Sequence, residues 1–233
     1  MEKASEKREA RVAIRYKNII KSLDNTWHVL DDTRVPIVRQ VLGWLDHPDQ
    51  KLKIIHIAGT NGKSSTGAMM GAVLQANGYS YGRFSSPFIL SAREQICIDD
   101  EMISKNDFVD YYERLIECFK LNSVSADYLT YFEYFTIISL LYFVDHQVDF
   151  VLFEAGLGGL RDATNAIDTP LLTVFTKISV DHQNLIGRNL TEISENTAAI
   201  IKKGTWVIDY AGQDLTARKV LKAQTEAVGA KWF

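Results

Sequence analysis

The sequence has 233 residues, a length that allows one large domain or two small ones with a sizeable core. Hydrophobic residues make up 46% and charged residues 24%, a composition typical of globular proteins and unlike that of disordered chains. The net charge of −3 excludes a broad basic field, so we expect neither nucleic acid nor a membrane as a partner, and the charged N-terminus favours the cytoplasm.

Hydrophobic periodicity divides the chain into alternating helices and strands. The first half is predicted to contain two amphipathic helices that form a lead-in over residues 1–45, then strand, helix and strand, at 3–23, 34–45, 53–58, 64–76 and 79–84. The second half is predicted to contain an alternating edge strand, two helices, two buried strands, then helix, strand and helix, at 93–100, 106–120, 130–144, 149–154, 171–175, 190–203, 205–208 and 214–228.

This alternation predicts an α/β fold, because strands that are apolar along their length need helices on both faces of a parallel sheet. Ligands of such sheets bind beyond the carboxyl ends of the strands. Those ends carry polar segments at four places, namely Gly59–Ser65, Ser85-Ser86, Glu154 and His182. We therefore expect these four segments to lie on one rim of the sheet.

The strongest chemical signal is the glycine-rich turn between the strand at 53–58 and the helix at 64–76. Its glycines let successive backbone N–H groups face an anion, and the helix that follows adds its positive end. Lys63 can reach the β- and γ-phosphates, and a serine hydroxyl after it can bind Mg²⁺. Ile57 stands where a standard P-loop has its first glycine, so this is a shorter form. The residues predicted to bind the nucleotide are Gly59, Thr60, Asn61, Gly62, Lys63, Ser64 and Ser65.

That short form is typical of the Mur ligase superfamily, and further segments in register resemble folylpolyglutamate and dihydrofolate synthases. The resemblance runs from about residue 41 to residue 233 and is carried by Ser85–Phe88, Thr130–Glu133, Phe153–Gly159, Asp162–Asn165, Asp181-His182 and Ala199–Lys202. It implies a P-loop NTPase-like fold of the Mur-ligase central-domain type. It also implies an ATP-dependent ligase that phosphorylates the carboxylate of a folate or dihydropteroate-like acid, so that the amino group of glutamate can attack.

The resemblance also implies roles for individual residues. Lys63, Glu154 and His182 are implied to be catalytic, and Ser86, Glu154 and His182 to hold Mg²⁺. The residues implied to contact the acid substrate are Arg93, Thr130, Phe132, Asp162 and Asn165. Taken without the resemblance, Glu154 could equally be a salt-bridged or helix-capping acid, and Phe132 could belong to a buried stripe with other apolar residues of its helix.

The sequence also departs from the family at several points. Thr197 stands where the family has a lysine, often carbamylated, that reaches the second metal, and a single arginine, Arg93, remains of the usual R-x-x-E-R loop. Residues 1–233 are expected to form the N-terminal ATP-binding domain, because a C-terminal glutamate ligase domain with an Asp-Gly-Ala-His-like segment is absent from the sequence. We expect a monomer that does not complete ligation alone. Two alternatives are a nucleotide-binding paralogue without ligase activity and a ligase for another acid.

Overall fold

A computed structural model describes residues 2–24 and 31–233, so Met1 and residues 25–30 of the predicted lead-in lie outside the described residues. The helices are α1 (Glu2–Asp24), α2 (Arg34–Trp44), α3 (Lys63–Ala76), α4 (Lys105–Leu121), α5 (Tyr131–Asp145), α6 (Gln183–Ile186), α7 (Leu190–Ala198) and α8 (Leu215–Val228). The strands are β1 (Ile54–Ala58), β2 (Tyr81–Phe84), β3 (Ile96–Ile98), β4 (Glu101–Met102), β5 (Phe150–Glu154), β6 (Leu172–Phe175), β7 (Trp206–Asp209) and β8 (Lys231–Trp232).

All these strands belong to one sheet, in the order β4-β3-β2-β5-β1-β6-β7-β8. The strands from β2 to β8 in this order run parallel, and β3 and β4 extend the β2 edge as an antiparallel hairpin. The predicted α/β fold with a parallel sheet is confirmed. Because β2, β5, β1 and β6 are neighbours with the same direction, their carboxyl ends meet at one rim, as the sequence predicts.

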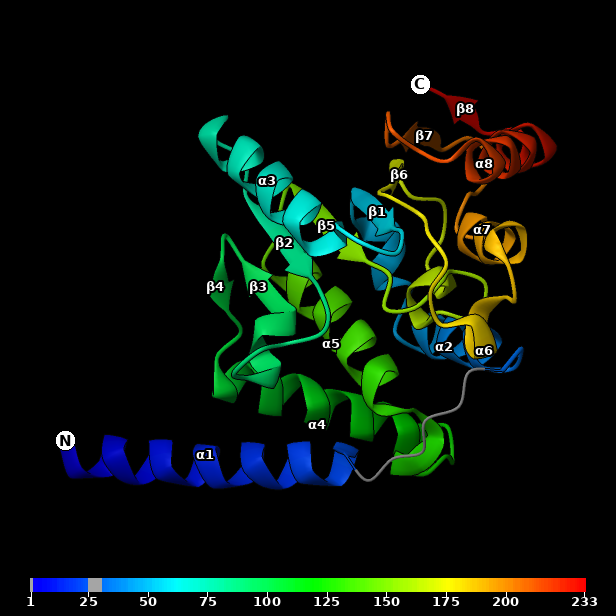
Figure 1. Cartoon of the computed structure of the whole chain (residues 1–233). Helices are drawn as coiled ribbons and strands as arrows, with labels where there is room; N and C mark the ends of the chain where they lie inside the picture. Colours follow the sequence, from blue (N-terminus) through cyan, green and yellow to red (C-terminus); the bar gives the residue numbers. More distant parts are fainter. Residues whose placement is uncertain (1, 25–30) are drawn as a thin grey trace.

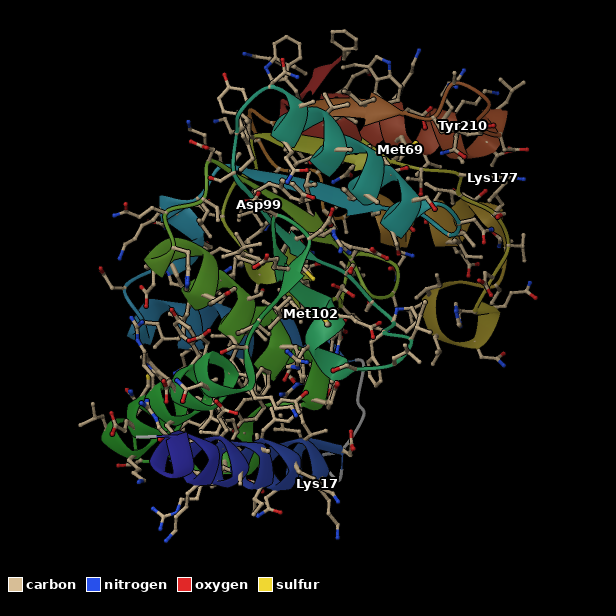
Figure 2. The ribbon with its side chains drawn as sticks, turned by 90° about the vertical axis from the view of Figure 1, so that its left-hand side faces the viewer. Lys17, Met69, Asp99, Met102, Lys177 and Tyr210 are labelled. Atoms are coloured by element: carbon tan, nitrogen blue, oxygen red, sulfur yellow. The ribbon has the colours of Figure 1, made fainter. Side chains whose placement is uncertain are left out.

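One face of the sheet is covered by α3. Its Met70 and Leu74 pack against a buried cluster formed by Ile55, Ile57, Tyr81, Leu152 and Val174. Figure 2 shows α3 in front of the sheet, with the labelled Met69 on this helix and 63% exposed. The period-two alternation of the strands thus places every second residue under α3.

The opposite face carries two larger clusters. Helices α2, α4 and α5 bury the first cluster over β2 and β5, where Phe84 and Phe153 of the strands lie together with Phe143 of α5. Helices α7 and α8 bury the second cluster over β6 and β7, around Phe175 and Val207. Figure 1 shows α1 lying along α4 at the edge of this helical layer. Helices therefore cover both faces, as predicted.

Three local features differ from the sequence prediction. The helix predicted to reach residue 203 ends at Ala198, and the segment after it carries buried Ile200 and Ile201 in a turn. The edge strand predicted over 93–100 is a 3-10 turn followed by β3, and Asp99 and Asp100 both have positive φ and turn the chain into β4. Helix α6 and strand β8 are too short to give a periodic signal. Within the described residues, no helix has the length and apolar character needed to cross a membrane.

Candidate nucleotide and substrate site

The glycine-rich turn joins the carboxyl end of β1 to the amino end of α3, as the sequence predicts. Gly59 has φ 141°, and a Cβ at this position would overlap Thr176 Oγ1 on the neighbouring strand end. Gly62 has φ 90° and caps α3. Both glycines therefore occupy conformations that L side chains rarely adopt, which explains why this turn needs glycine at these two places.

The loop that follows β6 anchors this turn through hydrogen bonds. The backbone N–H groups of Thr60 and Asn61 donate to the Lys177 carbonyl at 2.9 and 3.3 Å, and the Thr60 hydroxyl donates to the Ser179 carbonyl at 3.0 Å. Figure 2 shows the labelled Lys177 beside the loop that enters α3. These bonds fix the turn, so the first N–H groups of α3 are held in place at its positive end, where an anion can bind.

Lys63 and Ser64 connect this turn to the neighbouring strand. The Lys63 ammonium donates to the Gly59 carbonyl at 3.0 Å, so the side chain folds back over the turn. The Ser64 hydroxyl donates to Glu154 Oε1, at the carboxyl end of β5, over 3.0 Å. A P-loop lysine, a hydroxyl and a carboxylate therefore meet at the point where β1 and β5 end.

Glu154 is buried, with only 3% of its surface exposed. Burial raises its pKa to about 7, although the bond from Ser64 and the charge of Lys63 act in the opposite direction. A buried carboxylate at a strand end, held by one neutral hydroxyl, is a suitable ligand for a hard cation such as Mg²⁺. The residues present thus fit a cation here, and Ser86 follows β2, whose Phe84 pairs with Phe153 next to Glu154.

A small hollow of about 40 Å³ opens beside the glycine-rich turn. It is lined by Gly59, Thr60, Lys63, Gly156, Leu157, Gly158, Asp181, His182, Ile186 and Thr197. His182 has φ 46° and an exposed side chain, and its Nε2 lies 3.7 Å from Asp181 Oδ2. Thr197 is buried and donates its hydroxyl to the Ile193 carbonyl at 2.8 Å. His182 and Thr197 therefore reach the same hollow as Lys63.

The three residues implied to bind Mg²⁺ come from separate segments, because Ser86 follows β2, Glu154 ends β5 and His182 precedes α6. Among the described residues, no group of three or more His, Cys, Asp and Glu side chains is placed to hold a metal ion. The predicted set contains two such side chains, Glu154 and His182, with Ser86 as the third member. A cation at this rim would need phosphate oxygens to complete its shell, as is usual for Mg²⁺.

A larger cavity of about 370 Å³ lies next to the hollow. It is lined by Ser86, Thr130, Phe132, Glu133, Gly156, Leu157, Arg161, Asp162, Ala163 and Leu185. The cavity and the hollow share Gly156 and Leu157 as a common wall. This shared wall places a mainly apolar pocket directly beside the candidate phosphate site.

The amino end of α5 presents Thr130 and Phe132 to the cavity. Thr130 and Glu133 form a capping box, in which each side chain accepts from the backbone N–H of the other residue. Glu133 also forms a buried ion pair with Arg34 of α2, with Nε–Oε1 at 2.8 Å. Phe132 is half-buried and its ring lies 5.4 Å from that of Phe84, so it belongs to the core edge and to the cavity wall at once.

Asp162 forms another part of the cavity wall. It is 4% exposed and its carboxylate accepts from the backbone N–H groups of Leu157 and Thr164 at 2.8 and 3.0 Å. Burial raises its pKa, while these bonds act to lower it. Asp162 therefore holds the loop after β5 in its curved form as well as lining the cavity.

Two residues predicted to contact the acid do not line the cavity. Arg93 donates to the Ile103 carbonyl at 2.9 Å and faces a hollow beside α1, because it lies in the 3-10 helix Ala92–Gln95. Asn165 is buried, and its side chain donates to the Leu160 carbonyl at 3.3 Å. Leu185 and Leu157, which the sequence did not single out as site residues, line the cavity instead.

Curated proteins with similar sequences include dihydrofolate and folylpolyglutamate synthases. No protein-family model matches the chain. The dihydrofolate synthase/folylpolyglutamate synthase of Bacillus subtilis is 38% identical over 193 residues, which are 81% of this chain and 44% of that protein. The chain spans about half the length of the curated relatives it matches.

Solved structures that resemble this chain include folylpolyglutamate synthases. The apo form of L. casei folylpolyglutamate synthase has a TM-score of 0.85 at 32% identity, covering 94% of this chain and 53% of that one. A folylpolyglutamate synthase complex with AMPPCP and folate has a TM-score of 0.82 with the same coverage and identity. In sequence and in fold, the chain is a homologue of the folylpolyglutamate and dihydrofolate synthases that corresponds to about half of their length.

Proposed function

We propose that this chain is the N-terminal, ATP-binding part of a ligase that phosphorylates the carboxylate of a folate or dihydropteroate-like acid. The observation that carries the proposal is the wall of Gly156 and Leu157, which the P-loop hollow and the 370 Å³ cavity share. An acid bound in the cavity could bring its carboxylate to a terminal phosphate held at Lys63. Positioning of this kind supplies most of the rate in phosphoryl transfer.

In this proposal each part of the site has a separate task. The residues of Gly59–Ser65 hold the phosphates, and Lys63 offsets charge that develops during transfer. Ser86, Glu154 and His182 hold Mg²⁺, which would supply electrostatic stabilisation of the phosphates. The ring of Phe132 offers a face on which a flat heterocycle can stack, while Thr130 and Asp162 offer polar groups at the rim of the cavity.

Glutamate is the proposed amino-acid substrate, and a monomer the proposed state. Because the chain spans about half of its relatives' length, substrate binding is the appropriate readout for this chain. Turnover belongs to the full product of the gene, tested by ADP release that depends on both the acid and glutamate.

The test is a pair of calorimetric titrations, one with MgATP and one with folate. Lys63→Ala should weaken MgATP binding by at least about tenfold, since a charge-assisted contact to phosphate is lost. Phe132→Ala should weaken folate binding by about tenfold and leave MgATP unchanged. Lys222→Ala, on the exposed side of α8, is the matched control. Unchanged MgATP affinity in Lys63→Ala would overturn the nucleotide assignment.

A second candidate function is a nucleotide-binding paralogue that has lost ligation. Thr197 favours it, because this residue lines the hollow beside Lys63 and His182 and bears no charge. In that case MgATP would bind normally, whereas folate would not bind and would not stimulate ADP release. Glutamylated product from the full gene product would exclude this candidate.

A further inference from the structure

The segment that continues the cavity wall after β5 is contacted by Lys202, a half-buried lysine that lines neither the cavity nor the P-loop hollow. Lys202 lies in the turn after α7, and its ammonium donates to the carbonyls of Asn165 and Ile167 at 2.7 and 2.5 Å. Arg39 of α2 donates to the Ala166 and Asn165 carbonyls at 3.3 and 3.4 Å. Two cationic side chains therefore donate hydrogen bonds to three successive carbonyls, those of residues 165–167.

Those carbonyls belong to the last two residues of the 3-10 helix η4 (Ala163–Ala166) and to Ile167, its C-cap. The carbonyl end of a helix is its negative end, so cations there are stabilising. Asp162 caps the other end of η4. The segment is thus held by an anion at its N–H end and by cations at its carbonyl end, and its Asp162 and Ala163 form part of the cavity wall.

A third contact holds the middle of the segment to the sheet. Thr164 Oγ1 donates to Asp162 and lies 2.8 Å from Nε2 of His56, a fully buried residue of β1. Because the hydroxyl proton goes to Asp162, the His56 ring must donate through Nε2. Burial lowers the pKa of His56 to about 3, so this ring is neutral.

Lys202 has no carboxylate within ion-pair distance among the described residues. Removal from water lowers the pKa of Lys202 to about 8. Arg39 also acts to lower this pKa, whereas Asp168 and Asp49 act to raise it, so the ammonium remains mainly charged at neutral pH. An ammonium that is partly removed from water is costly unless its donors find acceptors. Here the carbonyls of Asn165 and Ile167 accept two of its three N–H groups, so the charge of Lys202 is directed at this segment.

We propose that Lys202 is a positioning residue for the cavity. Its hydrogen bonds to the carbonyl end of η4 fix the part of the wall formed by Asp162 and Ala163. The occupant of the cavity rests on the function proposed above, a folate-like acid. The P-loop is anchored by a different set of bonds, to Lys177 and Ser179. Lys202 therefore affects binding of the acid more strongly than binding of the nucleotide.

The experiment compares Lys202→Met with Lys202→Arg, and uses Lys203→Met as the control because Lys203 is the exposed neighbour. Calorimetric titrations with folate and with MgATP are carried out on each variant. Lys202→Met should bind folate roughly tenfold more weakly, with MgATP affinity within about twofold of wild type. Lys202→Arg keeps a charged donor and should restore most of the folate affinity. Equal affinities for folate in wild type and Lys202→Met, or equal losses for both ligands, would overturn the proposal.

Two further measurements keep the inference separate from the proposed function. Hydrogen exchange without ligand should show faster exchange at the Leu157 and Thr164 amides in Lys202→Met, with the Thr60 amide unchanged. If wild type binds no folate, the proposed acid is wrong, and the exchange result alone decides the role of Lys202. If Lys202→Met does not fold, Arg39→Met removes the weaker pair of bonds, and should give about a threefold loss for folate with the same selectivity. Unchanged exchange at both amides in whichever variant folds would refute the positioning role.

Discussion

Ser64 and Glu154, 90 residues apart in the sequence, are joined by a 3.0 Å hydrogen bond at the rim of the sheet. The bond links the first turn of α3 to the end of β5. Within residues 2–24 and 31–233, it is the only side-chain hydrogen bond to this buried carboxylate. A carboxylate with so little contact to water can bind a cation favourably. Without a cation, its negative charge destabilises the folded chain.

This arrangement predicts an unusual dependence of stability on pH. Because the pKa of Glu154 is raised to about 7 in the folded chain, from 4.5, folding favours its protonated form. Its contribution is therefore most favourable below pH 4.5 and is lost as the pH rises through 7. The difference corresponds to at most about 3 kcal/mol. Glu154→Gln should be more stable than wild type at pH 8 by up to this amount, and equally stable near pH 4.5.

Urea unfolding of the ligand-free chain at both pH values measures this effect. Asp149→Asn is the matched control, because Asp149 is an exposed acid whose pKa is lowered by its bonds to Ser80. That substitution should lower stability at pH 8. An equal gain for both variants would show that net charge, rather than burial of Glu154, governs the pH dependence.

Removal of Mg²⁺ gives a second prediction. If Glu154 and the phosphates share a cation, a chelator should weaken ATP binding to wild type, because the carboxylate then repels the phosphates. Glu154→Gln should bind ATP with nearly the same affinity with and without Mg²⁺. Titrations in both conditions, with Lys222→Ala as the control, measure the difference. Full Mg²⁺ dependence in Glu154→Gln would place the metal elsewhere.

The sequence alone predicts the rim of this site well and its walls poorly. The P-loop and Ser86 follow strands and Glu154 ends one, and neighbouring parallel strands bring their ends together whatever the loops do. Arg93 shows the limit. Its side chain turns to the Ile103 carbonyl because a 3-10 turn sets its direction, and the alternating pattern predicted a strand there. Leu185 reaches the cavity from a four-residue helix, α6, that leaves no periodic signal.

Contacts between residues far apart in the sequence are the other feature that local sequence patterns do not predict. Glu133 could be recognised as a helix-capping acid, since a threonine stands three residues before it. Its ion pair with Arg34 spans 99 residues and joins α2 to the cavity wall. The periodic pattern of residues 34–45 predicts a helix and gives no partner for this arginine. In the structure it is 2% exposed.

The Arg34–Glu133 pair gives a third prediction. Glu133→Ala removes the capping box and leaves a guanidinium buried without its carboxylate, which should destabilise the chain by about 3–5 kcal/mol. Glu133→Gln retains the capping geometry and one acceptor oxygen, so it should cost clearly less. Thermal or urea unfolding of the two variants measures the difference. Equal losses would mean that the charge of Glu133, and not its acceptor geometry, is what α2 and α5 require.

Gly156 gives the last prediction, because it lies in the wall that the cavity and the P-loop hollow share. A Cβ at this position would lie 2.7 Å from Phe132 Cζ and 3.2 Å from Asp162 Oδ2, so Gly156→Ala must displace the aromatic ring or the loop. We expect folate binding to weaken by about tenfold and stability to fall by roughly 1–3 kcal/mol, with MgATP binding little changed. Gly43→Ala is the control, since its Cβ would meet only His47 at an ordinary 3.6 Å within α2, where alanine favours the helix. Normal folate affinity in Gly156→Ala would show that the ring of Phe132 can move without cost, and that the acid binds away from this wall.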